Sequence, residues 1–179
     1  MRREDQMVSV LLISLSKGQK KLVKDFLREL RQNDGYLEVF ELQDVDQNNI
    51  EGNNFAEKLQ TCVTKICNVF IFVCSDELKK VVDDNEFDID NDIVKDAHVQ
   101  SVIRDMCNSE EVHSNSICVK LKESSCEKPK RLIDAECYPD DDIATVCSKL
   151  HGMVSEAESN AARDGGKKKK KNGKECVIC

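Results

Sequence analysis

Short apolar runs alternate along the chain with stretches whose apolar residues recur every three or four positions. An apolar run of four to eight residues bounded by turn residues predicts a buried strand. Such runs lie at Val8–Ile13, Tyr36–Leu42, Asn68–Cys74, Ser116–Leu121 and, more weakly, Ala135–Tyr138. Helical spacing of the apolar residues predicts helices over about 22–33, 55–66, 93–106 and 143–153.

This alternation of strands and helices predicts one α/β domain whose parallel sheet is covered on both faces. We predict a five-stranded, flavodoxin-like sheet of strand order 2-1-3-4-5, with Asn68–Cys74 at its centre. The polar segments Gln43–Asn54 and Asp83–Asp92 are expected to be loops. The domain is expected to span residues 1–154, and the polar composition of residues 155–179 predicts a disordered tail.

The third predicted helix carries the residues on which an interaction hypothesis depends. Its apolar stripe predicts which side faces the core: Ile93, Val94, Ala97, Val102, Ile103 and Met106.

Composition narrows the class of protein further. Hydrophobic residues make up 40% of the 179 residues and Trp is absent, so one core built from aliphatic residues and cysteine is expected. No secretory signal peptide is recognised, so the ten cysteines are interpreted as reduced thiols. Most are expected to pack in the core as small apolar residues: Cys62, Cys67, Cys74, Cys107, Cys118 and Cys147. No run approaches the roughly 20 apolar residues of a membrane-spanning helix.

The charges are distributed unevenly along the chain. Between Arg163 and Glu175 seven basic residues accompany two acidic ones, which gives +5 and leaves −12 for the remainder of a chain of net charge −7. An acidic body argues against nucleic acid as its partner, since phosphate binding needs a basic face.

The C-terminal residues Cys176-Val177-Ile178-Cys179 have the form of a prenylation box. We therefore expect a prenyltransferase to modify Cys176, although a terminal Cys leaves the choice of farnesyl or geranylgeranyl open. A single lipid chain binds a bilayer only marginally, and basic residues nearby strengthen the binding to anionic lipids of the inner leaflet. The lysines available for this are Lys167, Lys168, Lys169, Lys170, Lys171 and Lys174. The sequence thus predicts a lipid anchor on the cytoplasmic face of a membrane.

Two other interpretations of the tail remain open. The lysine run could be a nuclear localisation patch, and Cys176 with Cys179 could be a redox or metal pair. Both fit less well, because a redox pair usually begins a helix within a fold and a structural zinc site needs further ligands.

Catalytic and metal motifs are weak. The first predicted strand is followed by a segment with one glycine, Gly18, whereas the phosphate loop of Ras-type GTPases needs GxxxxGK[ST]. Asp44, Asp46 and Asn48 begin like a calcium loop, but the required Gly and Glu are replaced by Asn49 and Phe55. We therefore expect no metal site and no cofactor.

Residues 8 to about 153 resemble a SEFIR domain, the Toll/interleukin-1-receptor (TIR)-like domain of interleukin-17 receptors and their adaptor. The resemblance lies in VLLISLSKGQKKLVKDFLREL, in NVFIFVCSDELKKVVDD and in the later helix IVKDAHVQSVIRDM before SICVKL. It implies a signalling module that acts by homotypic association with other SEFIR or TIR-like domains of receptors or adaptors. Carried over by position, the exposed face of the third predicted helix is the expected interface, with Lys95, His98, Gln100 and Arg104.

The resemblance also suggests an enzymatic alternative. Some TIR-like domains cleave NAD with a glutamate that follows the third strand, and Glu77 occupies that position here. Shared fold is weak evidence for shared chemistry, so an adaptor or decoy module is the favoured interpretation.

Overall fold

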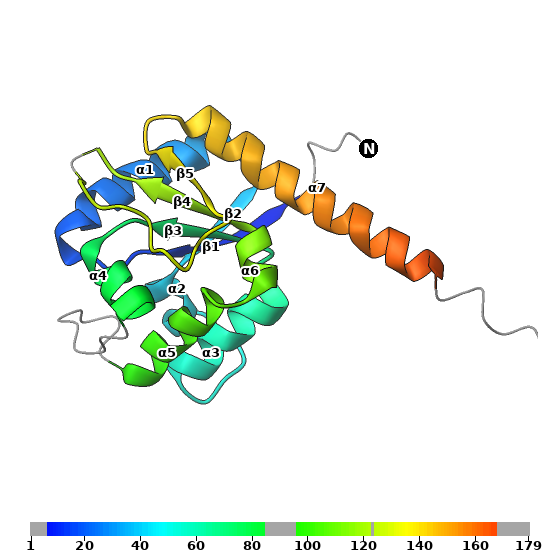
Figure 1. Cartoon of the computed structure of the whole chain (residues 1–179), viewed down its shortest axis with the longest axis horizontal. Helices are drawn as coiled ribbons and strands as arrows, with labels where there is room; N and C mark the ends of the chain where they lie inside the picture. Colours follow the sequence, from blue (N-terminus) through cyan, green and yellow to red (C-terminus); the bar gives the residue numbers. More distant parts are fainter. Residues whose placement is uncertain (1–6, 85–95, 123, 168–179) are drawn as a thin grey trace, which may run out of the picture.

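The computed structural model describes residues 7–84, 96–122 and 124–167, with side chains as far as Glu156. Its centre is a five-stranded parallel sheet of order β2-β1-β3-β4-β5 (Figure 1). The strands are β1 Val8–Ile13, β2 Leu37–Glu41, β3 Val69–Val73, β4 Ser116–Lys120 and β5 Glu136–Pro139. The predicted α/β class, the five strands and their flavodoxin-like order are confirmed.

Every residue of β3, the strand predicted to be central, is buried. It pairs with β1 through Val10 opposite Val69, and with β4 through Phe70 opposite Ser116. A strand with neighbours on both sides and helices on both faces has no exposed side, which explains its continuous apolar sequence. The edge strand β5 has no buried residue and accordingly gives the weakest sequence signal.

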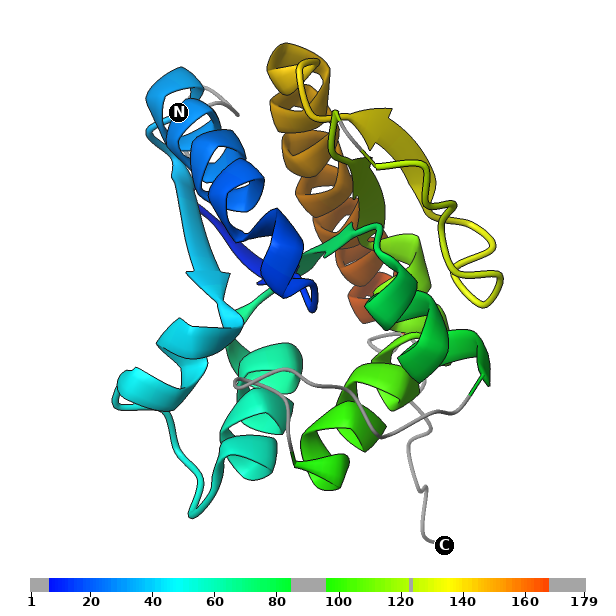
Figure 2. The same cartoon turned by 90° about the vertical axis from the view of Figure 1, so that its left-hand side faces the viewer.

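Two long helices cover one side of the sheet, called here the first face. They are α1 (Lys20–Asn33) and α7 (Ile143–Lys167), and Figure 2 shows them together on one side of the strands. The core of this face is mostly aliphatic. It joins alternate strand residues such as Val10, Leu12 and Ile71 to Leu27 and Leu150 of the helices.

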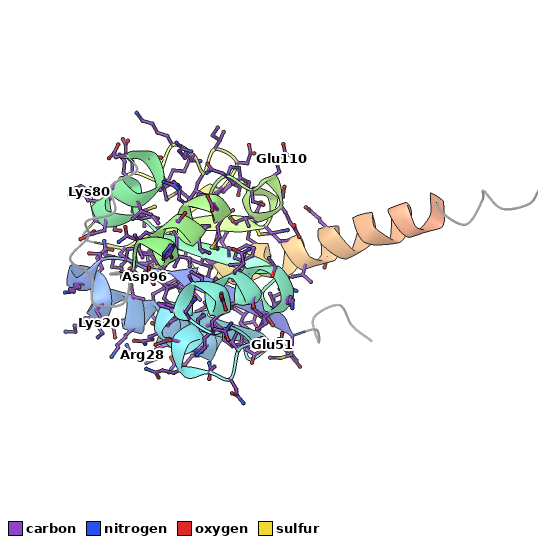
Figure 3. All side chains as sticks on the ribbon, turned by 90° about the horizontal axis from the view of Figure 1, so that it is seen from below. Lys20, Arg28, Glu51, Lys80, Asp96 and Glu110 are labelled. Carbon is purple, nitrogen blue, oxygen red and sulfur yellow. The ribbon has the colours of Figure 1, made fainter. Side chains whose placement is uncertain are left out.

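Shorter segments cover the other side, called here the second face. They are α2 (Leu42–Gln47), α3 (Phe55–Thr61) with the π-helical turn η3 (Cys62–Ile66), α4 (Asp76–Lys79) with the π-helical turn η4 (Lys80–Asp84), α5 (Ala97–Met106) and α6 (Glu110–Ser114). Figure 3 looks onto this face. Its core contains Phe70, Phe72 and most of the buried cysteines.

The second face holds several differences from the predicted elements. Helix α2 begins at Leu42, which was expected to end the second strand, and continues into the segment Gln43–Asn54 that was expected to be a loop. It begins with a capping box, in which the backbone N–H of Glu41 donates to Asp44 Oδ2 at 2.8 Å. Helices α4 and α6 were not predicted, because each is a short segment that completes the packing without a repeating apolar stripe of its own.

The connection from β4 to β5 forms no helix in its described residues, 121–122 and 124–135. Leu132 and Ala135 of this connection are nonetheless buried in the second-face core. The described part of this connection therefore packs as an irregular segment where a helix would usually cover the sheet.

Helix α7 extends well beyond the sheet. Of its side chains described, as far as Glu156, Val154 is the last one buried, whereas the helical backbone continues to Lys167, away from the rest of the domain (Figure 1). Disorder was expected from residue 155, but Ala and Glu between 156 and 162 are good helix formers. The His151 ring lies 2.6 Å from the Asp34 carboxylate and ties α7 to the end of α1.

The predicted burial of six cysteines is confirmed. All six are free thiols inside the molecule: Cys62, Cys67, Cys74, Cys107, Cys118 and Cys147. All but Cys147 belong to the second-face core.

Candidate functional site

The carboxyl ends of β1 and β2 border a cavity of about 260 Å³. Ligands of open α/β sheets bind at this edge, so the cavity is the first place to look for chemistry. Its floor is apolar, with Leu12, Val23 and Leu42. Its polar lining consists of Ser14, Ser16, Lys17, Lys20, Lys24, Glu41 and Gln43. Figure 3 shows Lys20 at this end of the sheet, on the same side as Lys80.

Glu41 is the carboxylate of this cavity, and it has a structural role. Its side chain caps α2 by accepting the backbone N–H of Asp44. Burial and the nearby Asp44 carboxylate raise its pKa, while Arg31 and Lys24 act in the opposite direction. A carboxylate that holds a helix start is poorly placed to accept a proton from a substrate, so the cavity lacks an evident general base.

Glu77, the candidate catalytic residue of the enzymatic alternative, lies on the four-residue helix α4 after β3. It is half-buried and is not among the residues that line the carboxyl-edge cavity. The start of α4 is fixed by Ser75, whose Oγ accepts the backbone N–H of Leu78 at 3.1 Å. The structure therefore places Glu77 as predicted, but it does not bring it together with the lining of that cavity.

The predicted interface residues of α5 do not share one exposed face. His98 is exposed, and its backbone N–H donates to the Asp96 carboxylate at 2.8 Å. Arg104 is half-buried and donates to Ser101 Oγ at 3.4 Å. Gln100 is fully buried, so its assignment to an exposed interface is wrong. Lys95 lies outside the described residues.

The error at Gln100 comes from the rotation of the helix about its axis. The predicted stripe placed Ala97 in the core, but Ala97 is exposed and Val99 is buried instead. Gln100 lies three positions before the buried Ile103, which puts both on the same side of the helix. The spacing of Val99, Ile103 and Met106 is the signal that would have identified the buried side.

Sequence reasoning missed a second part of this surface, in the β4–β5 connection. The Asp83 carboxylate accepts the backbone N–H groups of Lys130 at 2.9 Å and Arg131 at 3.3 Å. Arg131 Nη1 also donates to Asn108 Oδ1 at 2.9 Å, just beyond α5. These bonds fix the connection against η4 and α5.

The fixed connection presents Ile133 to solvent with 72% of its surface exposed. A single exposed apolar side chain is common on protein surfaces, so Ile133 contributes to a candidate contact only together with the charged and polar side chains near it in the sequence. The combined exposed region is called the α5 surface: His98, Asp105, Asn108, Arg131 and Ile133. Its sequence signal was the lone apolar Ile133 in an irregular charged stretch.

The predicted anchor lies almost entirely beyond the described residues. The backbone of Lys167 ends α7, whereas the other residues of the anchor are outside them: Lys168, Lys169, Lys170, Lys171, Lys174 and Cys176.

Among the described residues, no group of His, Cys, Asp or Glu is arranged to hold a metal ion. None of the described helices is long and apolar enough to cross a bilayer.

Comparison with protein-family models, curated proteins and solved structures gives no match. The sheet order is compatible with flavodoxin-like and TIR-like folds.

Proposed function

We propose that this chain is a SEFIR-type signalling module that binds other SEFIR or TIR-like domains of receptors or adaptors. In this proposal the body acts as adaptor or decoy at the cytoplasmic face of a membrane. A prenyl group on Cys176 and the lysines before it hold the chain there. The residues that bind the partner lie on the α5 surface.

The course of α7 is the observation that carries this proposal. The helix packs on the sheet through Val146, Leu150 and Val154 and then leaves the domain (Figure 1). At 1.5 Å per residue, the stretch from Val154 to Lys167 is about 20 Å long. The lysine run and Cys176 follow this projecting end in the sequence, so an anchored chain would leave the α5 surface accessible to a partner.

The two parts of the proposed anchor support each other energetically. One isoprenoid chain alone gives marginal, reversible binding. Each lysine near an anionic leaflet adds about 1 kcal/mol, so the run 167–171 strengthens that binding by several orders of magnitude at most. The body carries −12, so attraction to an anionic membrane must come from the tail.

Anchoring is tested by fractionating eukaryotic cells that express the full chain. Cys176→Ser should move the protein from the membrane fraction to the soluble fraction. Cys137→Ser is the matched control, because Cys137 is an exposed thiol of the folded body and should not affect location. Membrane association of Cys176→Ser equal to that of the parent chain would refute the anchor.

Partner binding is tested by capture of a second SEFIR domain with the purified chain. Ile133→Asp should weaken capture about tenfold or more, because it replaces the apolar side chain of the α5 surface with a charge that a partner would have to desolvate. Met7→Asp is the control, since Met7 is also exposed, at 53%, and lies before β1, far from the α5 surface in sequence. Equal capture by both variants would contradict the α5 surface as the interface.

The enzymatic alternative makes an opposite prediction for the same protein. The proposed module should release no nicotinamide from NAD. Release that Glu77→Ala abolishes would overturn the proposal and establish Glu77 as a catalytic residue.

A further inference from the structure

Two buried cysteines lie side by side at the amino edge of the sheet. The sulfur atoms of Cys62 and Cys67 are 3.5 Å apart, and one thiol donates a hydrogen bond to the other. A backbone hydrogen bond also joins the two residues, because the N–H of Cys67 donates to the carbonyl of Cys62 at 2.8 Å. Reacting atoms 3.0–3.5 Å apart are near the distance from which bonds form.

The wide turn η3 brings these thiols together. Cys62 is its first residue and Cys67 follows its last, in extended conformation, just before β3. A disulfide needs an S–S distance of about 2.05 Å, so the sulfurs must approach by about 1.5 Å. Both residues sit at the end of an element rather than inside a strand, which leaves side-chain rotation available for this approach.

Solvent reaches one member of the pair. Cys67 lines a cavity of about 500 Å³ between η3 and the α5–α6 segment, together with Thr64, Asn68, Asp105 and Asn115. Its exposed fraction is 7%, whereas Cys62 is completely buried behind it. A small reactant can therefore reach the Cys67 sulfur first, and the Cys62 sulfur lies next to it.

The hydrogen bond between the two thiols makes one of them more acidic and the other less so. It lowers the pKa of Cys62 despite its burial, while the same bond together with burial raises the pKa of Cys67. The hydrogen bond to Cys118 and burial raise the pKa of Cys74 to about 12, and burial raises that of Cys107 to about 12. Because the thiolate is the reactive form, a pair in which Cys62 ionises more readily is more reactive than Cys74 or Cys107.

We propose that Cys62 and Cys67 are a redox-sensitive dithiol that closes to an intramolecular disulfide when a small hydroperoxide enters the cavity. The ionised Cys62 sulfur accepts the proton of its hydrogen-bonded neighbour as the Cys67 sulfur attacks the peroxide. The O–O bond breaks, Cys67 becomes a sulfenic acid, and the leaving oxygen takes a proton from solvent and departs as an alcohol or water. The Cys62 sulfur then attacks the sulfenic sulfur, an S–S bond forms and water leaves. In sum, two thiols and one hydroperoxide give one disulfide, one alcohol or water and one further water. A dithiol reductant reverses the change.

Trypsin makes this disulfide directly visible. Cleavage after Lys58, Lys65 and Lys79 separates Cys62, in peptide 59–65, from Cys67, in peptide 66–79. The purified full chain is treated with hydrogen peroxide, alkylated, digested and measured by mass spectrometry. A cross-linked pair of these peptides should appear, and dithiothreitol should remove it. It should form at least about tenfold faster in the folded chain than in guanidinium, because folding places the sulfurs together.

Three variants make the assignment specific. Cys67→Ala and Cys62→Ala should each abolish the cross-link. Cys74→Ala is the matched control, since Cys74 shares peptide 66–79 and its loss should leave the cross-link unchanged. Circular dichroism verifies that each variant is folded.

Several outcomes would overturn the proposal. One is a cross-link that persists in Cys67→Ala, which would assign the bond to Cys74. Another is equal rates in folded and unfolded chain. A third is oxidation of Cys67 to the sulfinic acid with no cross-link. The comparison of folded with unfolded parent chain stands even if a variant fails to fold.

Discussion

The first face of the sheet is covered by two long helices with aliphatic stripes, whereas the second is covered by short, interrupted segments. On the first face, α1 spans Lys20–Asn33 and buries Val23, Phe26, Leu27 and Leu30. On the second face, α3 gives way to a π-helical turn after Thr61, and the core contains five buried cysteines. The difference separates a face packed by long aliphatic helices from the face on which the proposed α5 surface and the proposed dithiol lie.

The α5 surface and the Cys62–Cys67 dithiol both lie on the second face. The α5 surface depends on Asp83, which fixes the β4–β5 connection, and the dithiol depends on η3. Short segments that are held by caps and by neighbours open more easily than long helices. The same irregular segments place exposed side chains on the α5 surface and bring the two thiols of η3 together.

The largest expected effect tests the aliphatic character of the first face. Leu27→Ala should lower the free energy of unfolding by about 2–5 kcal/mol, because it removes a buried side chain and leaves a cavity. Cys118→Ala on the second face removes one buried sulfur atom and should lower it by about 1 kcal/mol. Urea denaturation followed by circular dichroism measures both. Equal losses would erase the energetic distinction between the two faces.

A smaller effect tests the loop that joins α2 to α3 on the second face. Gly52 has φ of 151°, and a Cβ at this position would lie 2.6 Å from the backbone nitrogen of Lys58. Gly52→Ala should therefore lower stability by about 1–3 kcal/mol. Gly35→Ala is the matched control, because a Cβ at Gly35 meets no atom within 4 Å. Thermal melts compare the two, and a harmless Gly52→Ala would show that this loop adapts.

The smallest effect concerns the cap of α2. The pKa of Glu41 is raised on folding, so the protonated form is favoured in the folded state. Its stabilising contribution is complete below the unfolded pKa, near 4.5, and is lost as the pH rises through the folded value. Glu41→Gln keeps an acceptor without the charge. It should be more stable than the parent at pH 7 by about 0.5 kcal/mol or less, and the difference should shrink at pH 4.

Melting temperatures at the two pH values measure this difference. A variant that is less stable than the parent at pH 7 would show that Arg31 and Lys24 outweigh burial at Glu41.

The first face could be predicted from sequence because its signals are periodic. Leu22, Val23, Phe26, Leu27 and Leu30 repeat at helical spacing, and α1 forms where they predict it. The inner strands could be predicted equally well, since burial on both faces makes them continuous apolar runs. The exposed edge strand β5 gave a weaker signal. The sheet order then followed from the usual connection of strand, helix and parallel strand.

The second face could be predicted only in part, because its elements depend on neighbours. Helix α2 rests on a reciprocal cap between Glu41 and Asp44 in a segment that looks like a polar loop. The exposed side of α5 was misjudged, because Ala97 was placed in the core whereas Val99, two positions later, is buried there. Two positions along a helix correspond to a rotation of about 200°, which puts Val99 on the side opposite Ala97, together with Gln100 and Ile103.

The thiol pair could not be predicted from spacing. Residues five apart in a regular α-helix lie on different sides of it. Cys62 and Cys67 meet because η3 is wider than an α-helix and because the chain leaves it at Cys67 toward β3. Their proximity is therefore a property of the π-helical turn rather than of the sequence interval.

The projecting part of α7 has an electrostatic consequence for an anchored molecule. A body of charge −12 would be repelled by an anionic leaflet if it rested against the lipid headgroups. At physiological ionic strength this repulsion decays over a Debye length of about 8 Å. A helical spacer of about 20 Å exceeds two such lengths. In an anchored molecule the acidic body would thereby be screened from the lipids that attract the lysines.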